Sequence, residues 1–379
     1  MDCNNCLPLD RLVSVDITTQ TVFDERQFGS MAILTDNLNG GIGGAASVVN
    51  ALNREKQYTT REAAVEDWDA STEVMKAITA AFAQTPRVSE IKVIYVDSSN
   101  VNTFPNELTE VFKCLDCTGI ISPDLRDRIN FQIAIADFIE PLNGKHFFFA
   151  DTLDPGTKDP NDAATTAGFI AAGGYSYTSA YYKADAEQFA AAAMSFALGQ
   201  DVDSVGAAFT MAFNKLNGLT PDLMSDAEAT AITGVLPSVG QSESYGHFAN
   251  TYTCVGGEEM MLYGSMGDGT YFDTALVAQY MKSTIQNNVA QLMASGVVGN
   301  DNSGLKLIGQ VIEFSLGQYQ GAGWIVGDNR EGGQQGYTVY IPGEATLAKR
   351  KDRITDAFRF EARLTGRVHA TSVVGELQY

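Results

Sequence analysis

Hydrophobic and polar positions follow two different periods along the first half of the chain. Short apolar runs predict buried strands at 28–34, 91–96 and 146–150. Apolar residues at helical spacing predict helices over 59–85, 106–115 and 124–139, and the first of these stripes is interrupted. Strands that alternate with helices favour an α/β layer with a mostly parallel sheet.

Helical patterns dominate the second half of the chain. An alanine-rich helix is predicted over 184–199, and a capping box opens another helix at Ser225. Two long amphipathic helices are predicted over 273–296 and 305–319, and strand patterns follow at 337–341 and 358–364. The complete pattern predicts a mixed α/β (α+β) protein.

Strand patterns also occupy both ends of the chain. Residues 11–18 alternate polar positions with Val13, Val15 and Ile17. The last twelve residues are rich in β-branched side chains, and the positions that mark this strand are Val368, Thr371, Val373, Val374 and Leu377. A strand without a partner is marginal in water and prone to aggregate. Both ends are therefore candidates for holding one subunit against another.

Composition and charge exclude several classes of function. The 379 residues are 45% hydrophobic and 19% charged, which is typical of a soluble globular protein. The formal net charge of −21 would repel a phosphate backbone, so no nucleic-acid partner is expected. Apolar runs are too short for a membrane span, and the first ten residues do not resemble a secretory signal. We expect no membrane partner and folding in a cytoplasm.

Basic residues concentrate near the C-terminus. Between 349 and 367 the chain carries seven positive charges, and the first four are Lys349, Arg350, Lys351 and Arg353. A basic segment on an acidic chain can pair with another copy, which favours ordered self-association. The alternative is a solvated helix face that balances nearby acids.

Two loops could be mistaken for ligand sites. The run from Gly41 to Ala46 fits a G-x-G-x-x-A pattern, but a mostly polar loop separates it from the preceding strand, so a flexible loop is the better interpretation. An acidic loop could hold a cation through Asp151, Asp154, Asp159 and Asp162. Its prolines and its spacing favour a solvated turn instead.

No catalytic motif stands out elsewhere. The three histidines are His146, His247 and His369, and none stands in a zinc-helix motif or beside a serine nucleophile. No Walker A sequence and no nucleophile elbow occur. The sequence predicts no catalytic residues, no metal and no cofactor, and each histidine is expected to be structural.

Five cysteines leave three interpretations open. Two C-x-x-C pairs consist of Cys3 with Cys6 and Cys114 with Cys117, and Cys254 stands alone. The pairs are too far apart for the usual zinc spacing, although four thiolates could bind zinc. Reduced thiols are expected in a cytoplasm, and inter-subunit disulfides could form in a particle later released to air.

The order of short motifs along the chain resembles the tail sheath subunit of a contractile bacteriophage, of the compact type. The motifs are LVSVDIT at 12–18, FGSMAILTD at 28–36, FAQTP at 82–86, FNKLNGLT at 213–220, GTYFD at 269–273 and RLTGRVH at 363–369. Each motif is short, and the similarity depends on their order along nearly the whole chain. Neither C-x-x-C pair belongs to this pattern.

The resemblance implies an assembly in which both arms add strands to sheets of neighbouring subunits. Hexameric rings would stack around a tail tube, contact baseplate and tail terminator proteins, and contract without ATP chemistry. The expected location is the virion, after assembly in the host cytoplasm. The implied divisions are an N-terminal arm at 1–18, a largely outer α/β body at 19–260, an inner domain at 261–364 and a C-terminal arm at 365–379.

The basic residues Lys349, Arg350, Lys351 and Arg353 would then face the tube or a neighbouring subunit. Two other classes of function remain. An α/β enzyme would bind a ligand or metal at the acidic loop or the Gly41 loop. Another virion tail or baseplate component would also associate through strands, although a tube protein is usually a smaller β-barrel.

Overall fold

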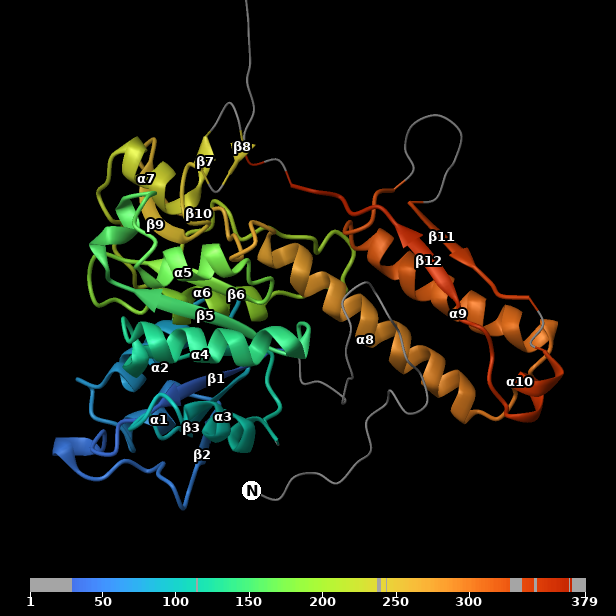
Figure 1. Ribbon diagram of the computed structural model, residues 1–379, viewed down its shortest axis with the longest axis horizontal. Coiled ribbons are helices and arrows are strands. Elements are labelled where there is room, and N and C mark those ends of the chain that lie inside the picture. Colours follow the sequence, from blue (N-terminus) through green and yellow to red (C-terminus); the bar gives the residue numbers. More distant parts are fainter. Residues whose placement is uncertain are drawn as a thin grey trace, which may run out of the picture.

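The computed structural model describes residues 29–113, 115–236, 240–242, 244–327, 336–343, 346–367 and 369. An eight-stranded sheet in the order β10-β9-β6-β5-β4-β1-β3-β2 lies at its centre (Figure 1). The strands are β1 Ser30–Thr35, β2 Glu55–Tyr58, β3 Glu90–Tyr95, β4 Gly119–Ile121, β5 Phe147–Thr152, β6 Thr178–Tyr182, β9 Asn250–Val255 and β10 Glu258–Leu262. A separate two-residue pair consists of β7 Val235–Leu236 and β8 Gly240–Gln241.

The middle of the sheet is parallel, as the sequence predicts, and its two edges are antiparallel. Ile33 of β1 lies between Val93 of β3 and Ile121 of β4 in parallel register. β2 and β10 pair antiparallel with β3 and β9. All residues of β1, β5 and β6 are buried, because helices cover both faces of the sheet and each strand can be apolar along its whole length.

Helices form a layer on each face of the sheet. The helices α2 and α6 pack on one face, and α3, α4 and α5 pack on the other (Figure 1). Their bounds, with the shorter helices, are α1 Arg61–Val65, α2 Glu73–Phe82, α3 Phe104–Phe112, α4 Ile129–Ile139, α5 Thr166–Gly173, α6 Phe189–Leu198 and α7 Asp226–Thr233. Single turns of 3-10 helix are η2 Ile42–Gly44, η3 Pro123–Leu125, η4 Glu140–Leu142 and η5 Pro155–Lys158. We call this sheet and its helices the body.

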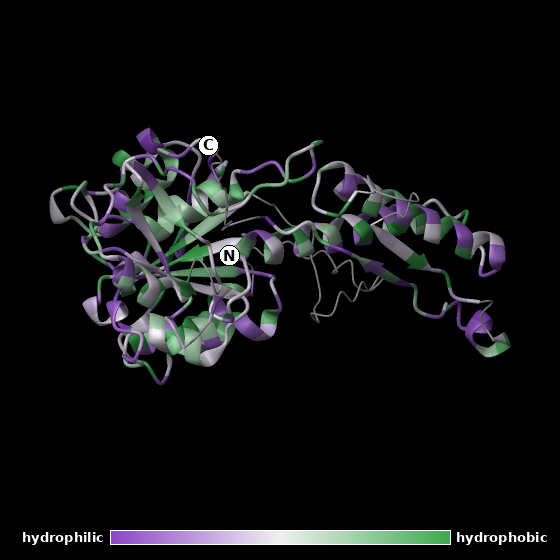
Figure 2. Ribbon diagram, turned by 90° about the horizontal axis from the view of Figure 1, so that it is seen from above, coloured by the Kyte–Doolittle hydropathy of each residue, from purple (hydrophilic) through white to green (hydrophobic). Residues whose placement is uncertain are grey.

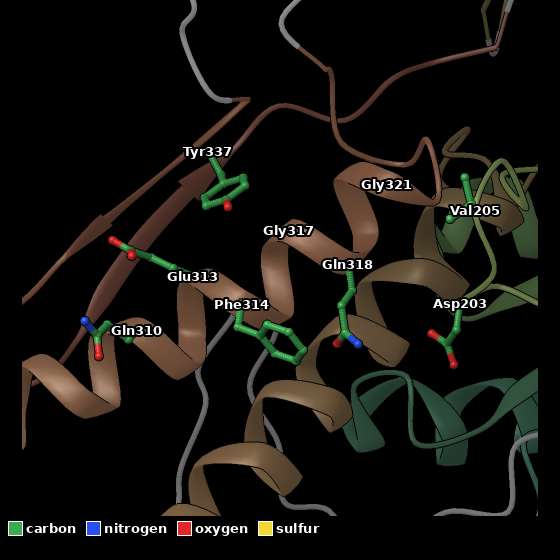
Figure 3. Close-up of a pocket in the computed structure, with 9 residues that line it drawn as sticks. All are labelled: Asp203, Val205, Gln310, Glu313, Phe314, Gly317, Gln318, Gly321 and Tyr337. Atoms are coloured by element: carbon green, nitrogen blue, oxygen red, sulfur yellow. The ribbon is translucent and has the colours of Figure 1, made fainter.

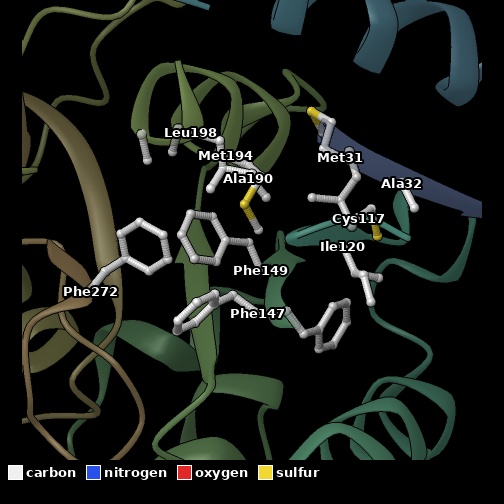
Figure 4. Packing of buried hydrophobic residues seen from close by; sticks show 14 of the residues in the cluster. Met31, Ala32, Cys117, Ile120, Phe147, Phe149, Ala190, Met194, Leu198 and Phe272 are labelled. Atoms are coloured by element: carbon white, nitrogen blue, oxygen red, sulfur yellow. The ribbon is translucent and has the colours of Figure 1, made fainter. Parts of the chain in front are cut away.

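Aromatic side chains fill the core between the sheet and the first turn of α8. Phe272 meets Phe147 at 5.0 Å and Phe149 at 4.9 Å between ring centroids, in edge-to-face geometry (Figure 4). Phe149 also stacks on Tyr181 at 4.4 Å. Hydrophobic strands lie at the centre of the body (Figure 2). Phe272 therefore fixes α8 to the centre of the sheet.

Beyond the body, the chain forms a narrow projection that we call the extension (Figure 1). It contains the outer part of α8 Phe272–Ala294, the packed helix α9 Asn302–Gly321, and the antiparallel strands β11 Tyr337–Tyr340 and β12 Arg359–Ala362. The short helix α10 Leu347–Lys351 lies at its far end. Both long helices agree with the predicted amphipathic patterns. None of the helices in the described ranges is long and apolar enough to cross a membrane.

Two predicted helices begin or end elsewhere than expected. The stripe at 59–85 is two helices, each with a threonine N-cap: Thr60 accepts from the Ala63 amide, and Thr72 accepts from the Met75 amide. The helix expected from residue 124 begins at Ile129, because Asp127 has a positive φ of 57° that a helix cannot contain. The capping box predicted at Ser225 is present at the start of α7.

Candidate functional site at the junction of body and extension

Three segments from distant parts of the sequence meet where the extension joins the body. They are the loop around Phe213, the turn from Tyr263 to Tyr271, and the chain that leads from β12 to His369. These segments contain parts of three motifs that carried the resemblance, at 213–220, 269–273 and 363–369. Residues far apart in the sequence thus build one cluster.

His369 lies inside an aromatic cage made of Phe213, Tyr263 and Tyr271. Its ring is perpendicular to Tyr271 at 4.6 Å and to Phe213 at 5.7 Å, and it lies 6.0 Å from Tyr263. Two cage residues have positive φ angles, 66° at Phe213 and 67° at Tyr263. Such angles cost energy for residues with large side chains, so the surrounding contacts must impose them.

Hydrogen bonds hold the first cage loop in this conformation. The side-chain amide of Asn214 donates to the backbone carbonyls of Thr210, Met211 and Ala212, at 2.6, 3.1 and 3.1 Å. The Phe213 amide donates to the Met261 carbonyl at 2.9 Å, which ties the loop to β10. Bonds from the Asn214 side chain and from the Phe213 amide therefore both hold the backbone at Phe213 in its positive-φ conformation.

Hydrogen bonds connect His369 through Thr210 to Asp273 at the start of α8. His369 Nε2 lies 2.9 Å from the Thr210 hydroxyl, which also hydrogen-bonds to Asp273 and lowers the pKa of that carboxyl. Burial has the larger, opposite effect and raises the Asp273 pKa. If the hydroxyl gives its proton to Asp273, Thr210 Oγ1 accepts from Nε2–H of the imidazole. Burial lowers the pKa of His369, against the attraction of Asp273, and so favours the neutral form of the ring.

The chain reaches His369 by crossing the junction in an extended path (Figure 1). The Arg363 amide donates to Gly336 O, the Arg363 carbonyl accepts from the Val326 amide, and the Thr365 amide donates to Trp324 O, each at 2.8 Å. The Arg367 guanidinium then donates to the Ala208 carbonyl on the body. Residues 363–367 and His369 therefore tie β12 to the body.

The strands β11 and β12 form a small sheet with open edges. Val339 pairs with Phe360, and both pack on the core, whereas the opposite face carries Thr338, Tyr340 and Glu361 in exposed positions. Within the described residues, the only further pairing is a bridge between Ile325 and Leu364 beyond the end of β12. A two-stranded sheet on one helix is marginal, so added strands would stabilise it.

The predicted basic residues lie together on α10 and the turn that follows it. Thr346 caps the helix by accepting from the Lys349 amide at 3.4 Å. The side chains of this patch are exposed, and they are Lys349, Arg350, Lys351 and Arg353. Lys349 pairs with Asp356. Leu347 is 86% exposed and Ile354 is 56% exposed, so the tip of the extension presents apolar and positive groups together.

The carboxyl ends of the parallel strands, where an α/β enzyme would bind a ligand, are occupied by the protein's own side chains. The Thr35 hydroxyl at the end of β1 donates to Asp124. The Arg126 guanidinium lies 3.5 Å from Asp151, which also accepts from the Ala190 amide at 2.9 Å. These side chains pair with one another across the strand ends, which favours a structural role for this edge.

Asp124 is expected to make stability depend on pH. Burial raises its pKa to about 6, so the folded state binds its proton more tightly than the unfolded state does. The resulting penalty is absent below the unfolded pKa of about 3.8, grows as the pH rises towards 6 and is complete above it. Asp124→Asn keeps an acceptor for Thr35 and should stabilise the protein by about 1–2 kcal/mol at pH 7.5. Urea unfolding at pH 4.5 and 7.5 measures this; an equal effect at both pH values would contradict it.

The acidic loop does not gather its carboxylates around a common point. Asp154 accepts from the Gly156 amide, Asp159 from the Asn161 amide, and Asp162 from the Ala164 amide, each within its own turn. No group of three or more His, Cys, Asp or Glu residues in the described ranges could hold a metal ion. These bonds agree with the turn that the sequence favours.

The fold has counterparts among solved structures. The helical sheath of the anti-feeding prophage in its contracted state matches 96% of this chain and 96% of its own, at 12% identity and a TM-score of 0.61. The contracted sheath complex of PVC, an extracellular contractile injection system, matches 97% of this chain and 96% of its own, at 13% identity and a TM-score of 0.59. A sheath tail protein from Listeria innocua matches 85% of this chain and 89% of its own, at 10% identity and a TM-score of 0.53.

The chain has the fold of a contractile sheath protein. No family model matches the sequence, and no curated protein matches it either. The sheath fold therefore covers the extension as well as the body, since the matches span almost the whole chain.

Many of the sequence-predicted contact residues lie outside the described part of this sheath fold. These are the arm residues Val13, Val15, Ile17, Val368, Thr371, Val373, Val374 and Leu377, and the cysteines Cys3, Cys6 and Cys114. Cys117 is buried beside His146, with its Sγ 3.9 Å from Nδ1. A bond from Cys117 to another subunit would need this side chain to leave the core, so the disulfide prediction depends on the other three. It stays a prediction.

The remaining histidines have structural contacts in the sheath fold. His146 Nδ1 lies 2.8 Å from the Cys117 carbonyl, and His247 Nε2 lies 2.7 Å from the Asp159 carbonyl. Sequence reasoning missed Thr210 and Tyr263, which carry no motif of their own. The short run from Thr270 to Asp273 was part of the resemblance, but nothing in it indicated a contact with His369.

An open groove of about 680 Å³ runs along α9 (Figure 3). Val205 and Phe314 line it and are 90% and 64% exposed, and Tyr337 of β11 lines it as well. Small-molecule sites usually enclose their ligand and present convergent polar groups. An exposed groove with exposed apolar side chains among polar ones is more typical of a contact surface.

Proposed function

We propose that this chain is the structural subunit of a contractile sheath, with no catalytic role. Hexameric rings of the subunit stack around a tail tube and contract to drive that tube through a target envelope. The observation that carries the proposal is the match of 96% of the chain to the fold of a contracted sheath, together with the open two-stranded sheet on the extension.

Strand exchange connects the subunits in this proposal. The N-terminal strand at 11–18 and the C-terminal strand that ends the chain join β11 and β12 of neighbouring subunits. The inner face of this small sheet is already covered by α9, and its edges are open. Added strands would satisfy the unpaired backbone groups that make such edges prone to aggregate.

The tip of the extension faces the tail tube. The exposed basic side chains of α10, with Leu347 and Ile354 beside them, form a patch that differs in charge from the rest of this acidic chain. Such a patch suits a tube surface with acidic and apolar groups. Baseplate and terminator proteins would bind the ends of the sheath.

The assembled particle is a phage tail or a similar virion-like particle, formed in the host cytoplasm. Contraction draws on the difference in free energy between two packings of the same subunits. This stored energy thus takes the place of nucleotide hydrolysis as the energy source. The sequence contains no nucleotide-binding motif, which agrees with such a mechanism.

Removing residues 1–18 should abolish tube formation, because this deletion removes the N-terminal strand. The full chain is expected to form long hollow tubes in negative-stain electron microscopy. Removing residues 1–10 is the matched control, since it leaves the strand at 11–18 in place and should leave tubes intact.

The two deletions separate the parts of the proposal. Normal tubes from the shorter chain lacking 1–18 would contradict exchange of the N-terminal strand. Globular particles from the full chain and from both deletions would contradict the sheath function itself. Thermal stabilisation of those particles by magnesium, calcium or a nucleotide would then favour an α/β enzyme.

A further inference from the structure

We propose that the aromatic cage of Phe213, Tyr263 and Tyr271 is the fixed root of the C-terminal arm, so that exchange between subunits involves only the residues after His369. This inference deepens the proposed sheath function and rests on it. It shortens the arm implied by the sequence, which begins at residue 365. His369 is thereby a positioning residue for assembly.

The contacts of residues 363–367 and of His369 carry this proposal. Backbone bonds attach Arg363 and Thr365 to the chain around Gly336 and Trp324, and Arg367 attaches to Ala208 on the body. His369 ends this path inside the cage, with a hydrogen bond to Thr210. A segment with bonds to its own subunit at this many points is not free to pair elsewhere.

The strain in the cage is a second, independent observation. Phe213 and Tyr263 both have positive φ angles although neither is glycine. Structures keep such conformations where the geometry serves a purpose. Here both residues place an aromatic ring beside the same histidine.

The root sets the reach of the arm. Ten residues follow His369 in the sequence, which span at most about 36 Å when extended. In this proposal the cage also keeps the single contacts of Thr365 and Arg367 closed, so its release would open them and move the attachment back to the bridge at Leu364, which leaves fifteen residues. The longer tether would lower the effective concentration of the arm at its acceptor roughly twofold.

The groups around the His369 ring shift its pKa, and that pKa reports whether the cage is intact. Asp273 of α8 faces the His369 ring through Thr210. Tyr263 and Tyr271 line the ring, and Arg367 precedes His369 in the chain. Burial lowers the His369 pKa below its usual 6.5. Loss of the cage should bring the pKa back towards 6.5.

Hydrogen exchange at the imidazole C2 position, followed by mass spectrometry over a pH series, reports the pKa of each histidine in the full chain. Tyr271→Ala should raise the pKa of His369 towards 6.5 and leave those of His146 and His247 unchanged. Tyr340→Ala, on the exposed face of β11, is the matched control and should change none of them. An unchanged His369 pKa in Tyr271→Ala would overturn the proposal.

A second pair of variants does not depend on Tyr271. His369→Ala should speed amide exchange at Thr365 at least tenfold and raise the concentration needed for tubes roughly twofold. A chain that ends at His369 should keep the wild-type exchange at Thr365 and form no tubes. Unchanged exchange in His369→Ala, or equally fast exchange in both variants, would overturn the proposal. If the wild-type chain formed no tubes, the sheath function would fail, while the pKa and exchange data would still test the cage.

Discussion

Replacing Phe272 with alanine is expected to lower the free energy of unfolding by about 3–5 kcal/mol. The ring is fully buried between Phe147 and Phe149, and its loss leaves a cavity where α8 meets the sheet. Urea unfolding of the unassembled protein, followed by the fluorescence of Trp68 in the body and Trp324 at the junction, measures the change.

Phe314→Ala is the matched control for this prediction. Phe314 lies on α9 and is 64% exposed, so its removal should change the free energy of unfolding by less than about 0.5 kcal/mol. An equally small effect of Phe272→Ala would mean that the first turn of α8 is not held by the aromatic core.

Reversing Lys349, Arg350 and Lys351 to glutamate is expected to prevent tube assembly while the subunit stays folded. All three side chains are exposed on α10, so the monomer loses only surface contacts such as the pair between Lys349 and Asp356. A patch that meets an acidic partner would instead become repulsive, which costs several kcal/mol across an interface. Negative-stain images and circular dichroism of the same sample test both statements.

A second triple variant separates the position of the charges from their number. Lys56, Lys113 and Lys215 are exposed lysines of the body, and each pairs with an acidic residue as Lys349 does. Reversing them changes the formal net charge of −21 by the same amount. Tubes should form from this control; normal tubes from the α10 variant would contradict a contact through the basic patch.

Long periodic segments made much of the fold predictable. The helices α8 and α9 and the strands β1, β3 and β5 lie where apolar spacing places them, because burial against a core fixes the period of apolar positions. The alternation of these elements also predicted the parallel sheet. The resemblance, which depended on motif order, agrees with the fold of the sheath structures.

The elements that sequence reasoning missed have weaker patterns. β6 reads TSAYY, with small and polar residues that become buried only because helices cover both faces. The hairpin of β9 and β10 turns at Gly256 and Gly257, whose φ angles are 63° and 94°. That Gly-Gly pair was a usable hairpin signal.

The candidate site was harder to foresee than the fold. Its contacts join Thr210, Phe213, Tyr263, Tyr271 and His369, which are separated by up to 159 positions. Side chains that meet only after folding leave no spacing in the sequence. The exposed basic residues of α10 were visible because charge density is a local property.

The way α8 joins the two parts has a mechanical consequence. Its first residue is locked in the aromatic core of the body, and its last turns lie in the extension beside α9. A helix of 23 residues is about 35 Å long and acts as a stiff lever. Turning the body by roughly 10° would swing the end of that lever by about 6 Å. Small rotations of the body would thus become displacements as wide as a turn of helix at the tip.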